Sequence, residues 1–147
     1  MIIKKESPHE FKQLDLHDFY ISKISYDIQD NIYQICLTGG DFNNKVKRTI
    51  MSYNVLYFKH SHFQPWNAED GPLIINICDI YSDIECAINQ FNFVHRRQLC
   101  IQDKQIYKAA GSSIDISNYF LFSILLTSGD TIDILTDRIE VENVEHI

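Results

Sequence analysis

Apolar and polar residues alternate along the N-terminal third of the chain, which is the pattern of β-strands buried on one side. The stretch from Tyr20 to Ile28 alternates in this way. After a turn at Gln29-Asp30-Asn31, the run from Ile32 to Leu37 returns as the second arm of a hairpin. From Val46 to Tyr57 the alternation changes phase near Ile50. That change predicts either a β-bulge or two strands separated by a bend.

A second hairpin is predicted near the C-terminus. Two β-type runs, Tyr119 to Leu126 and Thr131 to Leu135, flank the turn Ser128-Gly129-Asp130. The glycine can adopt a positive φ at little cost, as such turns require. In the second run, two isoleucines alternate with Thr131 and Asp133, so we expect a packed sheet with one face in water.

One segment favours a helix. Residues 79–93 carry apolar side chains at steps of three and four, and Ser82-x-x-Glu85 fits a capping box at the start. We expect a strand from Leu73 to Cys78 before it and another region of strand from Leu99 to Tyr107, with a turn around Asp103-Lys104. The predicted fold class is therefore α+β: a mainly antiparallel, twisted sheet, barrel-like or open, with one helix packed on it.

Length and composition favour one globular domain over residues 1–147. A chain of this size buries about 70% of its unfolded surface, and 45% of its residues are hydrophobic. The first residues lack the apolar segment of a signal peptide, and no run is long enough for a membrane span. We therefore expect a cytoplasmic protein with no membrane partner. Cys36, Cys78, Cys86 and Cys100 contain no C-x-x-C pair and mostly lie in or beside apolar runs, so we expect reduced thiols.

The charge distribution argues against nucleic acid as a partner. The formal net charge is −7, whereas phosphate binding needs basic side chains. No Lys or Arg occurs between Lys59 and Arg96, and the chain is again acidic from Asp130 onward. If the two acidic segments meet, they form a field that steers a basic partner; otherwise they are solvated faces that keep the protein soluble. The first segment contains Glu69, Asp70, Asp79, Asp83 and Glu85.

Candidates for catalysis and metal binding are few. His60-x-His62 would place two imidazoles on one face of a strand, but no third ligand is fixed by spacing, so ordinary histidines are the better interpretation. Asp15-x-His17-Asp18 resembles an acid–base pair, yet neighbours on a strand point to opposite faces, so we interpret it as a strand-entry turn. Motifs of hydrolases, zinc proteases and phosphate loops are absent. We therefore expect no enzyme and no cofactor.

Trp66 fits two roles. It is the single Trp of the chain, follows Pro65, and precedes the acidic pair Glu69-Asp70. An apolar anchor with a polar rim is typical of a protein interface. A Trp that folds back over the open end of the sheet is the alternative.

Four short motifs together resemble those of small bacterial β-rich proteins that include immunity proteins of polymorphic or contact-dependent toxin systems. They are Leu16-His17-Asp18, Ile24-x-Tyr26-Asp27, Pro65-Trp66 and Thr127-Ser128-Gly129-Asp130. The resemblance implies neutralisation of a toxin domain by direct binding, and it assigns no catalytic residues. The helix-like segment 79–93 departs from a purely β pattern.

Three functional hypotheses follow. The first is a non-enzymatic binding protein, most concretely an immunity protein, whose acidic surface with Trp66 as anchor masks a basic partner. The second is a small-molecule binding or enzymatic domain with a pocket at the open end of the sheet, near His60 and His62. The third is an assembly subunit that forms a homodimer through a strand edge.

Overall fold

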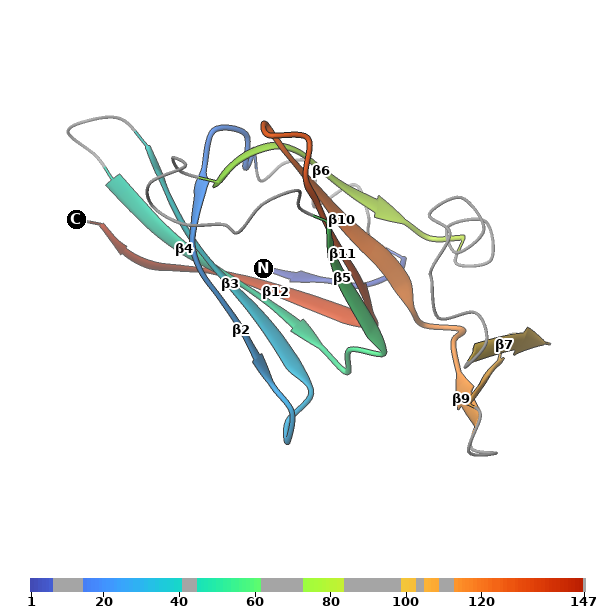
Figure 1. Ribbon diagram of the computed structural model, residues 1–147. Helices are drawn as coiled ribbons and strands as arrows, with labels where there is room; N and C mark the ends of the chain where they lie inside the picture. Colours follow the sequence, from blue (N-terminus) through green and yellow to red (C-terminus); the bar gives the residue numbers. More distant parts are fainter. Residues whose placement is uncertain are drawn as a thin grey trace.

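Every regular element in the described part of the chain is a β-strand (Figure 1). The computed structural model describes residues 1–6, 15–40, 45–61, 73–83, 99–102, 105–108 and 113–146. Its strands are β1 (Ile2–Ile3), β2 (Tyr20–Asp27), β3 (Ile32–Gly40), β4 (Lys45–Tyr53), β5 (Tyr57–Ser61), β6 (Leu73–Tyr81), β7 (Leu99–Gln102), β8 (Gln105–Lys108), β9 (Ser113–Asp115), β10 (Phe120–Leu126), β11 (Thr131–Thr136) and β12 (Arg138–His146).

The predicted α+β class is wrong, because the described residues contain no helix. β6 covers the expected strand and continues through Tyr81 into the segment expected to be helical. The physical reason is pairing with β10: Asp79, Ile80 and Tyr81 lie opposite Ser123, Phe122 and Leu121. These sheet hydrogen bonds outweigh the weak local helix signal. Residues 84–93 lie outside the described residues. No helix that could cross a membrane is found within the described ranges.

Nine of the strands form one antiparallel sheet in the order β1-β12-β4-β3-β2-β6-β10-β11-β5. The sheet is open, with β1 and β5 as its outer strands, and it bends so that β5 and β11 lie across from β3 and β4 (Figure 1). Two contacts show this approach: the rings of Tyr33 and Phe58 lie 5.0 Å apart, and the Thr136 hydroxyl donates to the Tyr53 carbonyl at 2.5 Å. A separate three-stranded sheet has the order β7-β8-β9.

The core lies on the concave side of the bent sheet. Alternate residues of β10, from Phe120 to Leu126, point into it and are fully buried. β3 contributes Tyr33, Ile35 and Leu37 from the facing half of the sheet. Burial of these large side chains supplies most of the favourable free energy of folding, at about 1.5–3 kcal/mol each.

Both predicted hairpins are confirmed. β10 and β11 pair around Gly129, whose φ is 90° and whose amide donates to the Leu126 carbonyl at 2.9 Å. The change of phase near Ile50 is explained by two strands and a bend, since β4 pairs with β3 without a register shift. The bend lies at Asn54, where φ is 50°, a conformation that asparagine tolerates better than most residues.

Gly39 in β3 leaves room for the Phe19 ring. A Cβ at position 39 would lie 2.5 Å from Cδ1 and 2.6 Å from Cε1 of Phe19. The Arg48 guanidinium carbon lies 5.0 Å from the centroid of the same ring. Because Gly39 has no side chain, the Phe19 ring packs directly against its backbone. This contact helps to hold the turn that precedes β2.

Gly39→Ala is therefore expected to lower the free energy of unfolding by about 1–3 kcal/mol, because the added methyl overlaps the Phe19 ring. Urea denaturation of the single variants and of Gly39→Ala combined with Phe19→Leu tests this contact. In the double variant, Phe19→Leu should recover part of the free energy of unfolding that Gly39→Ala loses, because the leucine side chain is smaller than the ring. Strictly additive effects would contradict the proposed contact.

Candidate functional site

One of the residues predicted to bind a partner, Asp79, borders a cavity of about 340 Å³ beside β6. It is lined by the turn before β2 and by the middle of β6, through Asp15, Leu16, His17, Asn76, Ile77, Cys78 and Asp79. Two carboxylates, Asp15 and Asp79, thus border one hollow although they are far apart in sequence. Ile77 is 51% exposed, so an apolar surface adjoins the acids.

Backbone hydrogen bonds hold the turn against β6. The Phe19 amide donates to the Leu16 carbonyl at 3.2 Å and closes the turn. The Asp18 amide donates to the Ile75 carbonyl at 3.1 Å, and the Ile75 amide donates to the Phe19 carbonyl at 2.8 Å. Asp15 and Asp18 have φ values of 40° and 70°, so each side chain leaves the backbone in a direction that a strand would not allow.

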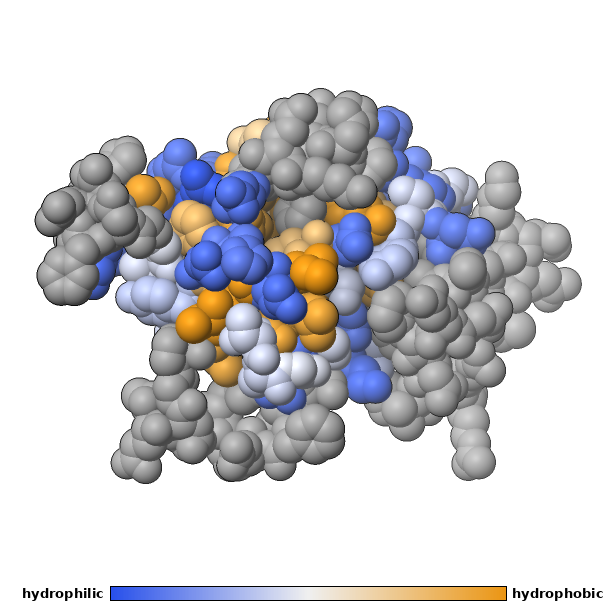
Figure 2. Space-filling model, turned by 90° about the horizontal axis from the view of Figure 1, so that it is seen from above, coloured by the Kyte–Doolittle hydropathy of each residue, from blue (hydrophilic) through white to orange (hydrophobic). Residues whose placement is uncertain are grey.

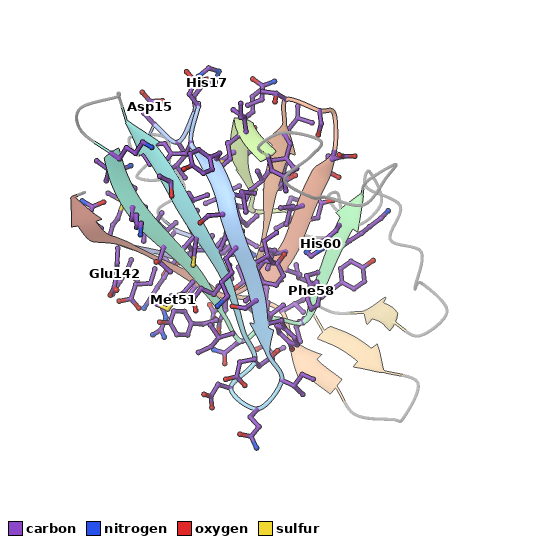
Figure 3. All side chains as sticks on the ribbon, turned by 60° about the vertical axis from the view of Figure 1, so that its left-hand side comes forward. Asp15, His17, Met51, Phe58, His60 and Glu142 are labelled. Atoms are coloured by element: carbon purple, nitrogen blue, oxygen red, sulfur yellow. The ribbon has the colours of Figure 1, made fainter. Side chains whose placement is uncertain are left out.

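This geometry corrects the expectation that His17 and Asp18 point to opposite faces. His17 Nδ1 lies 3.0 Å from Asp18 Oδ2. The expectation assumed an extended strand, whereas both residues belong to the turn, as interpreted from the sequence. The pair is exposed at one end of the molecule (Figure 3), and the view onto this end shows hydrophilic residues beside apolar ones (Figure 2).

Cys78 contributes no reactive thiolate to the cavity. It packs against the core, and burial, reinforced by the neighbouring charge of Asp79, raises the pKa of its thiol to about 12. At neutral pH the sulfur is protonated and a poor nucleophile. Cys78 therefore lines the cavity as a small apolar side chain.

Beyond Asp79, a row of polar residues crosses four strands on the face of the sheet opposite the core. Asp79, Ser123, Asp133 and Lys59 lie in register on β6, β10, β11 and β5. The expectation that Asp133 lies in water is wrong, because the residue is only 5% exposed. Burial raises its pKa, while the Ser123 hydroxyl, which donates to Oδ1 at 2.6 Å, and the charge of Lys59 lower it.

The raised pKa gives Asp133 a predictable effect on stability. Its charged form is disfavoured in the folded state, so Asp133→Asn, which still accepts from Ser123, should raise the free energy of unfolding at pH 7. This difference should shrink as the pH falls through the folded pKa and vanish below the ordinary value of 3.8. Ser123→Ala should instead lower the free energy of unfolding by about 1–3 kcal/mol, because the buried carboxylate loses its donor.

Urea titrations of the wild type and both variants between neutral pH and the ordinary carboxyl pKa provide the measurement. A constant difference between wild type and Asp133→Asn over that range would contradict the assignment to Asp133.

The other predicted partner-binding residues are placed only in part. Asp83 follows β6 and is exposed. Trp66, Glu69, Asp70 and Glu85 lie outside the described residues. The carboxylates of the C-terminal segment do not all lie near Asp79. Asp133 lies in the same cross-strand row as Asp79. Asp137 precedes β12 and Glu140 and Glu142 lie on it, in the other half of the sheet.

His60 belongs to an aromatic cluster and not to a described metal site. It contacts the Tyr33 hydroxyl through Nε2, and Phe58 packs between Tyr26 and Tyr33 with centroid distances of 4.8 and 5.0 Å. Figure 3 places Phe58 and His60 together on β5, away from the turn with Asp15 and His17. His62 lies outside the described residues, and within the described ranges no three His, Cys, Asp or Glu side chains gather closely enough to hold a metal ion.

Sequence reasoning missed Asp15 and Ile77 as parts of the site. Their signal is weak, since it consists only of a polar residue before a short turn and an isoleucine in a strand. They are brought together by the backbone hydrogen bonds between the turn before β2 and Ile75 of β6, which are not local in sequence. No family model matches this chain, and no curated protein matches it.

Proposed function

We propose that the protein is a non-enzymatic binding protein, most concretely a cytoplasmic immunity protein that neutralises a basic toxin domain. The observation that carries this proposal is the cavity bordered by Asp15 and Asp79 beside exposed Ile77. A partner's Lys or Arg side chain fits such a hollow, because its charge meets carboxylates while its alkyl stem lies on the isoleucine.

The charge of the whole chain supports the same proposal. A net charge of −7 repels acidic partners and attracts basic ones over a distance of about 10 Å at 0.1 M salt. Asp83 extends the acidic surface beyond the end of β6. Asp133, which is buried in the same cross-strand row as Asp79 with Ser123 between them, adds to the local field without contacting a partner.

Protection of cells from the toxin tests the proposal. The gene directly upstream should encode a large secreted toxin, whose C-terminal domain stops growth when expressed alone. Coexpression of this chain should restore growth, and the two purified proteins should form a stable complex. A metabolic gene neighbour, or unchanged growth arrest during coexpression of the folded chain, would overturn the proposal.

The strand-edge alternative is also favoured by one observation. β5 is an outer strand of the large sheet, and Phe58 on it is 37% exposed beside Tyr26, which is 36% exposed. An aromatic patch at a sheet edge suits pairing of two copies. Molar mass by light scattering at rising concentration tests this alternative: it predicts a dimer that forms as the concentration rises, and a constant monomer mass would contradict it.

A further inference from the structure

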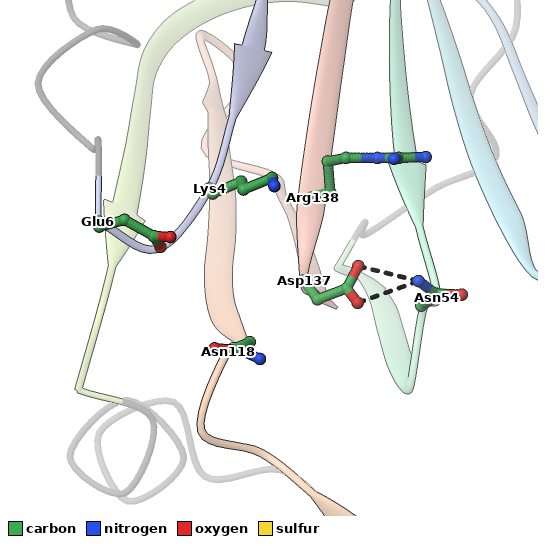
Figure 4. Close-up of a pocket in the computed structure, with 6 residues that line it drawn as sticks. All are labelled: Lys4, Glu6, Asn54, Asn118, Asp137 and Arg138. Carbon is green, nitrogen blue, oxygen red and sulfur yellow. Dashed lines mark hydrogen bonds between the residues drawn. The ribbon is translucent and has the colours of Figure 1, made fainter.

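A second cavity, of about 250 Å³, lies where the start of the chain meets the junction of β11 and β12. Figure 4 shows its six lining residues, which are all polar or charged and come from four separate segments. They are Lys4, Glu6, Asn54, Asn118, Asp137 and Arg138. None of them belongs to the acidic cavity beside β6.

The floor of this cavity is rigidly built. Asn54 adopts its left-handed conformation at the bend, and its Nδ2 donates to both Asp137 carboxylate oxygens at 3.2 and 3.0 Å. The hydroxyl of Tyr119, a residue only 9% exposed, donates to the Asn54 carbonyl at 2.9 Å. Side chains held by a second layer of contacts keep their positions before a ligand arrives, which lowers the entropic cost of binding.

Arg138 has unused hydrogen-bonding capacity. Its guanidinium carbon lies 4.0 Å from the centroid of the Tyr53 ring, and the Tyr53 hydroxyl donates to Glu140 at 2.9 Å. The Nε of Arg138 is buried and has no hydrogen-bond partner among the described residues. Because Nε is closed to solvent, a ligand carboxylate in the cavity would meet the terminal guanidinium nitrogens of Arg138, and charged donors of this kind form strong hydrogen bonds with carboxylates.

The charged residues that line the cavity suit a ligand that carries both a positive and a negative group. Lys4 and Arg138 balance Glu6 and Asp137, in contrast to the acidic character of the whole chain. A single anion would meet two carboxylates, and a single cation would meet two basic groups. A dipolar ligand places each end against its opposite charge, and the two asparagines supply neutral donors and acceptors.

We propose that this cavity binds a small zwitterion of the α-amino-acid class. Its carboxylate lies against Arg138 and Lys4, and its ammonium group against Glu6. The size agrees, because 250 Å³ is below the range of about 300–1,000 Å³ that accommodates drug-sized ligands. The inference does not depend on toxin binding, because the two cavities share no residue.

Thermal denaturation and titration calorimetry of the full chain with a panel of free α-amino acids test the proposal. At about 100 times its Kd, the right amino acid should raise Tm by about 5–10 °C. Its N-acetyl derivative and its methyl ester, which each lack one charge, should bind at least about tenfold more weakly. The panel is measured first because it identifies the ligand.

Glu6→Gln and Arg138→Lys should each weaken the binding of that amino acid at least about tenfold, whereas Glu142→Gln, an exposed site elsewhere on β12, should leave it unchanged. The Tm of each variant without ligand establishes that it folds. The proposal is overturned if no amino acid binds at millimolar concentration, if the blocked derivatives bind equally well, or if both cavity variants bind like the wild type.

Discussion

Replacing Phe122 with alanine is expected to lower the free energy of unfolding by about 3–5 kcal/mol, the largest effect of any single substitution considered for this protein. The ring is fully buried on β10, between Ile80 of β6 and Ile134 of β11. Its removal leaves a cavity where the two halves of the bent sheet pack together. Folds of this size are stable by about 5–15 kcal/mol, so the loss would unfold a sizeable fraction of molecules near physiological temperature.

Urea denaturation of Phe122→Ala beside Leu125→Ala provides the comparison. Leu125 lies on the same strand but faces away from the core and is partly exposed, so its truncation should cost less. Equal losses for the two variants would contradict the assignment of the core to the concave side.

Reversing two charges, with Asp79→Lys and Asp83→Lys combined, is expected to slow association with the proposed toxin domain at least about tenfold at low salt. Asp79 borders the acidic cavity and Asp83 is exposed beyond β6, so both face an approaching partner. Stopped-flow mixing gives the rate. Glu142→Lys, which makes the same type of change on β12, is the matched control and should have a much smaller effect.

The strands were predictable where their signal was local. The alternation in β2 and the turn around Gly129 are sufficient to indicate the two hairpins, because the two arms of each are neighbours in the chain. The division between β4 and β5 was also open to prediction from the change of phase, although only the structure places the bend at Asn54.

The helix was wrongly predicted because the spacing of apolar residues is a local signal, whereas the strand is stabilised by pairing with a segment far away in the sequence. In Asp79–Tyr81 the helical and strand patterns overlap, and pairing with β10, some forty residues later, decides between them. The buried state of Asp133 escaped prediction for a similar reason. A polar residue in an alternating strand normally faces water, and nothing in its own segment reveals a covered outer face.

The candidate site could be predicted only as a charge pattern. The gap in basic residues between Lys59 and Arg96 drew attention to Asp79, which borders the cavity; its role in binding stays a prediction. The partner carboxylate of Asp15 and the cavity itself depend on the packing of a turn against β6. The cavity around Arg138 depends on the pairing of β1 with β12, which joins opposite ends of the chain.

The most direct test of the proposed function is the salt dependence of the association rate between this chain and the toxin domain. Between about 0.01 M and about 1 M salt the Debye length falls from about 30 Å to about 3 Å, so long-range attraction is removed. The wild-type rate should fall steeply and converge with that of the Asp79→Lys, Asp83→Lys variant at high salt. A wild-type rate that does not change with salt, or two rates that fall in parallel without converging, would contradict recognition through the acidic surface.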